Sequence, residues 1–450
     1  MEMLETTPVK TIGTNQNLYD VLQERGIIVF SQNITLVKKN QFGKRFIRIR
    51  LDIIDCRKQF TIFLNEEKTP VMVINHLNQF QEAYQQIRDK IKPEEVLSIQ
   101  EMLRELDEKK LKFSIPHSYY FSIGETAYLI DSSTSKKRAL NIKSHLHSTA
   151  KPFHILSSHY HPDHWANNVL LANRNTRIYV HHAAREIFMP GYHVLMYTYL
   201  AKFFKTVDVV DVIRRTFRLS RRMLGLAAFF IRKTPILAIL VFQAYNMKFV
   251  ERFRSGKKHF YYLDKDDQVV FEDINMSGWK ITDGLIALET PGHSYDHLAF
   301  YIPDRKTLFT GEIDVFLNPV SIIDCPQPLI HATIDQVIQL VITENIDLLL
   351  PSHYLPISGN QKIVEHLTEQ KEKLQHCYQS ICNIILEQTS WEWRKLMQAV
   401  YQSSDQIIQE AIRLNWPKTI SNLDIYVAFV LQELGYVMVD PSTKTWRISK

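Results

Sequence analysis

The stretch SSHYHPDHWAN, residues 157–167, concentrates side chains that can titrate or bind a metal ion. These side chains are His159, Tyr160, His161, Asp163 and His164. Imidazole and carboxylate groups together suit Zn²⁺, with iron or manganese as alternatives. In a loop that follows a strand, His159 and His161 can converge on one ion, while Asp163 and His164 face a second position. The stretch by itself leaves two interpretations open, a metal site and a loop that is rich in histidine by chance.

Further candidate ligands follow other apolar stretches of the chain. ETPGHS supplies His293 and LLPSHY supplies His353, each just after a predicted strand and beside a proline. LFTGEID supplies Glu312 and Asp314, again after an apolar stretch. The set then holds five imidazoles and two or three carboxylates, which is enough for two metal ions.

Other histidines are expected to have structural roles. The segment KSHLHSTAKPFH is expected to be a polar, solvated loop, and His181 and His182 are expected to pack at the end of a strand. His297, in HSYDHLAF, is expected either to be a core histidine or to orient a ligand or substrate.

The elements that must position these groups are a mixture of strands and helices. Strand character occurs in KFSIPHSYYFSIGETAYLIDSS, FHIL, TRIYVHH, WKITDGLIALE, HLAFYIPDRKTLFTG and IDLLLPSHY, and PLIHATIDQVIQLVI is predicted to be a helix. The candidate ligands repeatedly come just after strands. An α/β layered fold places its ligand-binding loops at such positions.

The length and the cysteine usage limit the class of protein. A chain of 450 residues predicts two or three domains. Its four cysteines are scattered without a CxxC pair, which argues against a disulfide framework and fits a reducing compartment. The N-terminal residues MEMLETTPVK lack the apolar stretch of a signal peptide, so a cytoplasmic location is expected.

Residues 1–111 are expected to form an α+β extension that carries no chemical motif. Its predicted strands are IIVF, NITLVKK and RFIRIRLDII, and its predicted helices are VINHLNQFQEAYQQIRDKI and PEEVLSIQEMLRELDEKK. The extension is interpreted as a packing or oligomerisation element, and a homodimer is one expected outcome.

Residues 195–258 interrupt the layered pattern with a helical, apolar and basic insert. The part from 202 to 258 carries 14 Lys/Arg against three acids, although the whole chain has a net charge of only +6. The stretch MLGLAAFFIRKTPILAILVF has Arg232, Lys233 and Pro235 at its middle, so no transmembrane helix is predicted. Three interpretations stay open: a helical cap, a membrane-surface element that covers the active site, and a basic arm that binds nucleic acid.

The ligand pattern resembles the metallo-β-lactamase superfamily of hydrolases. The HxHxDH motif of that family is matched in full by residues 159–164, and the resemblance spans about 115–360 without the insert. It implies an α/β (α+β) fold, a four-layer αββα sandwich at 112–360, and two zinc ions. By this resemblance His159, His161 and His293 hold one ion, and Asp163, His164 and His353 hold the other. Glu312 stands where the family places an acid between the ions, and Asp131 matches the acid that supports the site after the first strand pair.

Three departures from the family pattern affect the details of the site. TGE replaces the usual TGD, so either Glu312 bridges differently or Asp314 takes the role. WANN follows the motif where the family has a glycine pair, and Ser352 precedes His353 where the family has glycine. None of these changes removes a histidine ligand.

Residues 361–450 resemble the winged-helix-like domain of a β-lactamase-like subgroup that includes acyl-thioester hydrolases and endoribonucleases. The segment is predicted to be mostly helical, and its charge is nearly neutral. A winged helix that binds duplexes is usually more basic. The segment is therefore interpreted as a packing domain that helps to wall the active site.

The favoured function is a metal-dependent hydrolase with a metal-bridging hydroxide that Asp163 orients. Its expected substrate is an ester, thioester or lactone of an apolar acyl group, with the insert as a lid or peripheral membrane contact. The alternatives are a nucleic-acid phosphodiesterase similar to an endoribonuclease and a non-catalytic metal-binding protein. No Ser–His–Asp arrangement or P-loop competes with the metal site.

Overall fold

The computed structural model describes most of the chain outside the insert. The described residues are 18–31, 34–39, 46–54, 57–64, 70–75, 77, 79–88, 91, 93–108, 116–187, 259–313, 325, 327–414, 422–440 and 445–449. The insert predicted at 195–258 and Asp314 lie outside them. The chain divides into two units, the smaller with residues 1–29 and 33–109, the larger with residues 30–32 and 110–450. The domain boundaries expected at 111 and 361 remain predictions.

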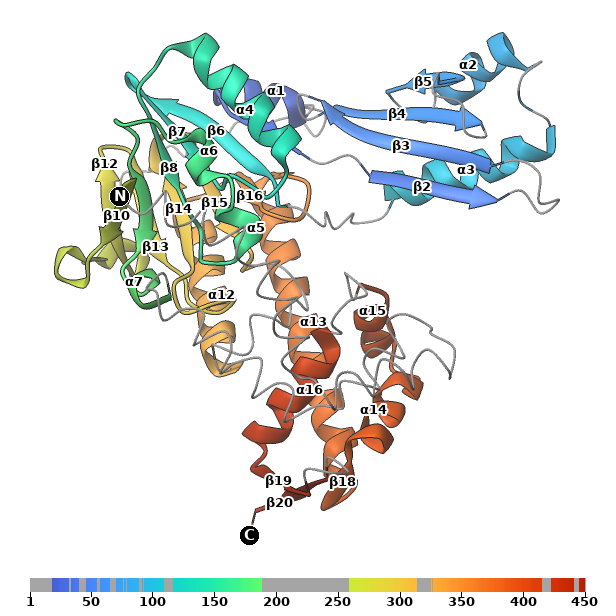
Figure 1. Cartoon of the computed structure of the whole chain (residues 1–450), viewed down its shortest axis with the longest axis vertical. Coiled ribbons are helices and arrows are strands. Elements are labelled where there is room, and N and C mark those ends of the chain that lie inside the picture. The colour runs from blue at the N-terminus through green and yellow to red at the C-terminus, as the bar shows by residue number, and fades with distance from the viewer. Residues whose placement is uncertain are drawn as a thin grey trace, which may run out of the picture. The chain divides into compact units, whose positions relative to one another are not determined.

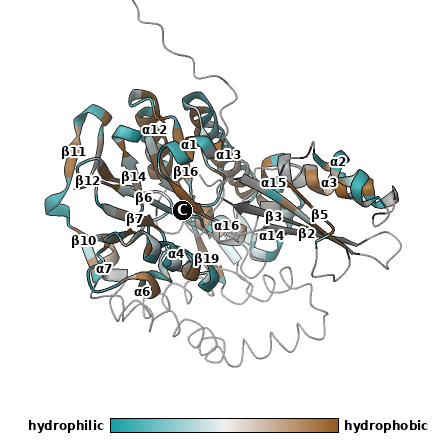
Figure 2. Ribbon diagram, turned by 90° about the horizontal axis from the view of Figure 1, so that it is seen from above, coloured by the Kyte–Doolittle hydropathy of each residue, from teal (hydrophilic) through white to brown (hydrophobic). Residues whose placement is uncertain are grey.

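The smaller unit contains a four-stranded antiparallel sheet and helices. The sheet has the order β2 (Ile34–Lys39), β3 (Phe46–Ile54), β4 (Arg57–Leu64) and β5 (Met72–Ile74). The helices are α1 (Leu18–Glu24), α2 (Gln79–Ile87) and α3 (Pro93–Glu108). In β3 the buried side chains Ile47 and Ile49 share one face, as the alternation of a strand requires. Both α2 and α3 carry hydrophobic and hydrophilic residues (Figure 2), as helices on a sheet do.

The larger unit is built on two sheets. In the larger unit the first has the order β6 (Ser118–Ile123), β7 (Thr126–Ile130), β8 (Phe153–Leu156), β9 (Ile178–His181) and β10 (Phe260–Leu263), and the short strand β1 (Ile28–Phe30) contains residues of both units. The second has the order β11 (Val269–Phe271), β12 (Met276–Thr282), β13 (Leu285–Glu289), β14 (Leu298–Ile302), β15 (Thr307–Gly311), β16 (Leu348–Pro351) and β17 (Ile357–Ser358). Phe309 of β15 lies 5.4 Å from Tyr119 and 5.2 Å from Phe121 of β6, measured between ring centroids. The two sheets therefore pack face to face through their aromatic side chains.

Helices cover the outer faces of both sheets (Figure 1). Next to the first sheet, α4 (Lys136–Thr149) buries Ala139, Ile142 and Leu146 at three- and four-residue spacing. The His145 ring of α4 lies 4.5 Å from the Tyr120 ring of β6. The second sheet shares its core with α12 (Gln327–Thr343) and α13 (Asn360–Leu386). The result is the predicted four-layer αββα sandwich.

Helix α4 corrects one expectation from the sequence. The segment expected as a polar loop places His145 and His147 on this helix, and His154 lies in β8. Ser135 caps the N-terminus of the helix, and its hydroxyl accepts a hydrogen bond from the backbone N–H of Arg138. This N-cap and the buried stripe outweigh the low helix preference of the histidine- and serine-rich sequence.

The C-terminal segment shares one hydrophobic core with the second sheet. It contains α14 (Trp393–Gln402), α15 (Gln406–Leu414) and α16 (Asn422–Glu433), with a small sheet of β18 (Ser390–Glu392), β20 (Thr445–Ile448) and β19 (Tyr436–Asp440) in that order. Buried Trp393 and Tyr426 belong to the same cluster as Leu349 of β16. The segment is thus packed onto the sandwich, and its winged-helix-like character remains a prediction. Among the described residues, no helix has the length and apolar character to cross a membrane.

Candidate metal centre

The chain delivers its candidate ligands from the ends of strands in both sheets. His159 and His161 follow β8 and lead into the short helix α5 (Pro162–Trp165), which holds Asp163 and His164. His293 follows β13, Glu312 follows β15 directly, and His353 follows β16. The buried strands are rigid, so they fix the positions at which these loops begin.

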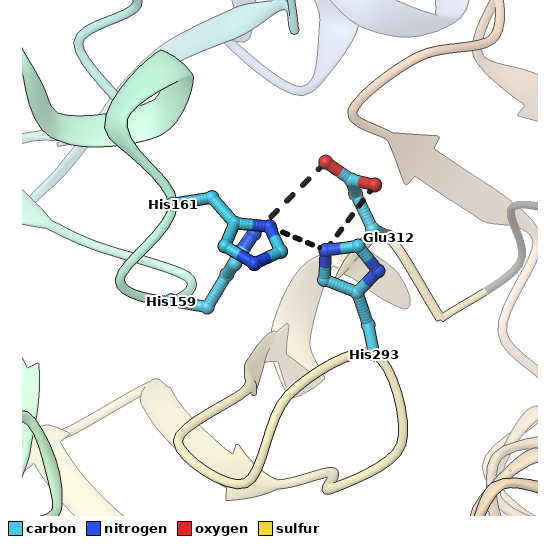
Figure 3. Close-up of side chains that lie close together, drawn as sticks. All are labelled: His159, His161, His293 and Glu312. Atoms are coloured by element: carbon cyan, nitrogen blue, oxygen red, sulfur yellow. Dashed lines mark hydrogen bonds and ion pairs between the residues drawn. The ribbon is translucent and has the colours of Figure 1, made fainter. Parts of the chain in front are cut away.

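The first group consists of His159, His161, His293 and Glu312, whose ligand atoms all lie within 4.8 Å of one another. Figure 3 shows the three imidazoles and the carboxylate pointing toward one another. His293 Nε2 lies 2.8 Å from His161 Nδ1 and 3.4 Å from Glu312 Oε2. His159 Nε2 lies 3.9 Å from Glu312 Oε1. Four ligand atoms around one small volume are typical of a zinc position.

The second group consists of Asp163, His164, Glu312 and His353, within the same distance limit. Glu312 Oε1 lies 2.7 Å from His164 Nε2 and 2.9 Å from His353 Nε2. Asp163 Oδ2 lies 3.8 Å and 4.0 Å from the same two nitrogen atoms. The Asp163 side chain is 37% exposed, whereas those of the other three are at most 5% exposed. Asp163 therefore stands where the centre meets solvent.

Glu312 joins the two groups, which addresses the open question about the TGE motif. Its Oε1 faces the histidines of the second group and its Oε2 faces His293 of the first. The extra methylene of glutamate thus lets the carboxylate face both groups. Asp314, the alternative, lies outside the described residues.

Burial controls the charge of two of these histidines, His159 and His293. Burial, reinforced by the neighbouring histidines, holds the pKa of His159 well below its usual value. Burial likewise lowers the pKa of His293, against the opposing charge of Glu312. Neutral imidazoles have a free nitrogen lone pair, which is the form that binds metal ions.

His164 and Glu312 form the charged part of the centre. Burial alone would lower the pKa of His164, but Asp131 and Asp163 raise it well above its usual value. Burial alone would raise the pKa of Glu312, but His293 and His353 hold it well below its usual value. Metal binding would displace the proton between His164 and Glu312, because a ligand must present its lone pair to the ion.

The chemistry of the donor set fits two metal ions. Together the two groups contain five imidazoles and two carboxylates. The Nε2 atom of His159 is buried and has no hydrogen-bond partner among the described residues. A buried polar atom without a partner is costly, and a metal ion at the first group would satisfy it.

A buried network behind the ligands contains Asp131 and Ser158. Asp131 follows β7 with a positive φ of 55°, and its carboxylate accepts a hydrogen bond from His164 Nδ1 at 2.7 Å. The backbone N–H and the hydroxyl of Ser158 donate to the same carboxylate. The sequence patterns give Ser158 no role, since a serine is not a typical metal ligand. Its place directly before His159 was the available signal, and the adjacent Ser157 made that signal ambiguous.

His297 lies behind Glu312. Its Nε2 accepts a hydrogen bond from the backbone N–H of Glu312 at 3.0 Å, so its Nδ1 carries the proton and donates to Thr290 Oγ1 at 2.8 Å. Burial lowers the pKa of His297 to about 3, so the ring stays neutral. Of the two expected roles, this geometry favours a buried histidine that holds protein groups.

Tyr160 and His181 belong to neither ligand group. The Tyr160 carbonyl accepts a hydrogen bond from Trp165 Nε1 at 2.6 Å, and its ring lies 4.8 Å from that of His161. His181 Nε2 lies 3.3 Å from Glu289 Oε1 and belongs to neither group.

Gly311 allows the close approach of β15 to His297, and replacing it with alanine is expected to destabilise the fold. Gly311 has a φ of +60°, and an added Cβ would overlap His297 Nε2 and lie 2.8 Å from its Cε1. Strained packing of this kind costs about 1–3 kcal/mol, in addition to the strain of a left-handed backbone. Gly124→Ala is the matched control, because Gly124 has a φ of +55° but no heavy atom within 4 Å of its added Cβ. Urea unfolding of both variants measures the difference, and an equal loss of stability in both would contradict the packing role of Gly311.

One comparison with known proteins identifies a family. A family model of the metallo-β-lactamase superfamily matches residues 111–353. A search of curated proteins gave no match. Among solved structures, a metallo-β-lactamase family protein from Thermus thermophilus is 15% identical, with 74% of this chain and 94% of that chain covered and a TM-score of 0.41. The inverting sec-alkylsulfatase Pisa1 from Pseudomonas sp. is 14% identical, with coverage of 73% and 49% and a TM-score of 0.41. The metallo-β-lactamase FIM-1 from Pseudomonas aeruginosa, in its mono-zinc form, is 10% identical, with coverage of 75% and 95% and a TM-score of 0.34.

Proposed function

Because the chain belongs to the metallo-β-lactamase superfamily, a superfamily of metal-dependent hydrolases, we propose that it hydrolyses an ester, thioester or lactone of an apolar acyl group at a two-ion centre. The observation that carries the proposal is the pair of ligand groups that share Glu312. His159, His161 and His293 would hold the first ion. Asp163, His164 and His353 would hold the second, and Zn²⁺ suits both donor sets.

The chain's own residues then have distinct roles in hydrolysis. When bound, the metal ions would activate water as a nucleophile at neutral pH and polarise the scissile carbonyl. Asp163, the partly exposed member of the centre, would orient that water and take up its proton. The buried carboxylate of Glu312 would balance positive charge between the two groups. Because the Glu312 side chain is only 1% exposed, bulk water has little access to that side of the centre.

The choice of an acyl substrate is supported by the composition of two segments of the chain. The insert at 195–258 is rich in apolar residues, as MLGLAAFFIRKTPILAILVF illustrates, and the segment from 361 to the end is nearly neutral. An apolar cover suits a greasy acyl chain better than a polyanion. Peripheral membrane contact through the insert, a homodimer and a cytoplasmic location are further parts of the proposal.

A nucleic-acid phosphodiesterase is the second candidate, and the basic character of the insert favours it. Arg214, Arg215, Arg218, Arg221 and Arg222 lie close together in the sequence and could bind phosphates. This candidate predicts binding to RNA that weakens steeply with salt.

A substrate panel separates the two candidates. Purified full-length protein would be assayed with p-nitrophenyl esters of increasing acyl length, an acyl thioester, a lactone and single-stranded RNA, each before and after chelation. The acyl proposal predicts chelator-sensitive ester or thioester turnover that improves with acyl length. RNA cleavage without acyl turnover would reverse the order of the two candidates.

A further inference from the structure

Ser158 connects the carboxylate of Asp131 to the first ligand group. We propose that Ser158 is a positioning residue, and that through it one carboxylate fixes the orientation and tautomer of a histidine in each ligand group. The inference rests on the proposed metal centre, and it concerns how the protein prepares the ligands before an ion binds.

The direction of each hydrogen bond follows from the protons available. Ser158 Oγ lies 2.8 Å from Asp131 Oδ2 and 3.0 Å from His159 Nδ1. A carboxylate can only accept, and a hydroxyl has a single proton, so Ser158 donates to Asp131 and accepts from His159. His159 therefore carries its proton on Nδ1. The Nε2 atom of His159 then has a free lone pair. This atom lies 3.9 Å from Glu312 Oε1.

His164 meets the same carboxylate without an intermediary. Its Nδ1 lies 2.7 Å from Asp131 Oδ2, much closer than the 3.3 Å that separates it from Ser158 Oγ. Because the carboxylate accepts, His164 Nδ1 donates, and Nε2 is the atom that faces Glu312 at 2.7 Å. Asp131 thus acts directly on the second group and through Ser158 on the first.

The backbone holds Ser158 firmly in this position. Its N–H donates to Asp131 Oδ1 at 2.9 Å, and its carbonyl accepts from the N–H of Leu298 at 2.7 Å. Asp131 and Ser158 are both fully or almost fully buried, so water is poorly placed to replace the hydroxyl. A partner that orients a metal-binding histidine in this way contributes strongly to metal affinity.

Zn²⁺ titration of metal-free variants against a chromophoric chelator tests the inference by binding rather than by activity. Ser158→Ala is expected to weaken binding to the first group by about 10- to 100-fold and to leave the second group within about twofold. Asp131→Asn tolerates the positive φ of that position and is expected to weaken both groups. His353→Ala and His293→Ala each remove a ligand of one group, so they identify which group each binding step belongs to. Ser158→Thr keeps the hydroxyl and is expected to restore binding.

Matched controls separate positioning from general damage. Ser157→Ala removes a neighbouring buried hydroxyl, which accepts from Asn168 Nδ2 at 3.1 Å, and it is expected to leave both affinities unchanged. If the alanine variant does not fold, Ser158→Gly also removes the hydroxyl and is expected to give the same loss at the first group. Equal weakening of both groups by Ser158→Ala, or no change at either, would overturn the inference. A wild-type protein that binds no zinc would overturn the metal centre itself.

Discussion

Replacing Glu312 with glutamine is expected to empty both ligand groups and to reduce hydrolysis by at least about 100-fold. Loss of a residue that only supports a ligand already costs up to about this factor, and Glu312 belongs to both ligand groups. Glutamine preserves the size of the side chain but removes its charge and replaces one oxygen with an amide nitrogen. The two groups contain five imidazoles and only two carboxylates. Glu312 is therefore one of the two carboxylates in the groups that balance the charge of the ions, and it is the buried one of the two.

The metal content and the hydrolysis rate of the Glu312→Gln variant would be measured together. Glu289→Gln is the matched control, because Glu289 also ends a strand and pairs with a histidine, His181, yet belongs to neither group. This control is expected to retain metal and activity. A Glu312→Gln variant that keeps two ions would show that Glu312 does not join the groups.

Replacing Asp163 with asparagine is expected to reduce kcat by about 10²- to 10⁴-fold, the range for loss of a general acid or base. Asp163 is the partly exposed carboxylate of the centre. Its Oδ2 lies 3.8 Å from His164 Nε2 and 4.0 Å from His353 Nε2. It is thus the group best placed to exchange a proton with an entering water. The first group does not contain Asp163, so that group is expected to keep its ion.

Steady-state kinetics and metal content would be measured on the same Asp163→Asn preparation. Asp283→Asn is the control, because the Asp283 side chain is 94% exposed and pairs with Lys280 at the surface. A large loss of kcat is expected for Asp163→Asn and none for Asp283→Asn. Unchanged kcat in the Asp163 variant would remove this residue from the reaction.

The layered fold could be predicted from the sequence because its strands are short apolar runs bounded by turns. Strands that are stabilised mainly by pairing with neighbouring strands were harder to predict. The sequence patterns predict neither β4 nor β5 in the smaller unit, where RKQFTIFL begins with three polar residues. Strand β18 is only three residues long and lies within a stretch that was expected to be helical. Its pairing with β20 overrides the local helix preference.

The prediction for the candidate site was more detailed than that for the fold, because the resemblance to a family assigned individual residues. Residue types and spacing indicated a metal site, and the resemblance divided the residues into two sets. The distances required the structure, because His159, His293, Glu312 and His353 follow different strands that are far apart in the sequence. Ser158 could not be identified in advance, since a hydroxyl that acts through another residue leaves no spacing pattern.

The most direct test of the central claim is a titration of metal-free protein with Zn²⁺, in which bound metal and hydrolysis of the best acyl substrate are followed together. About two tightly bound ions per chain are expected, in line with a two-ion centre, and no hydrolysis is expected before metal is added. Hydrolysis is expected to rise as the two groups fill. Full hydrolysis by the metal-free protein, or fewer than about one bound ion per chain at saturation, would contradict the account.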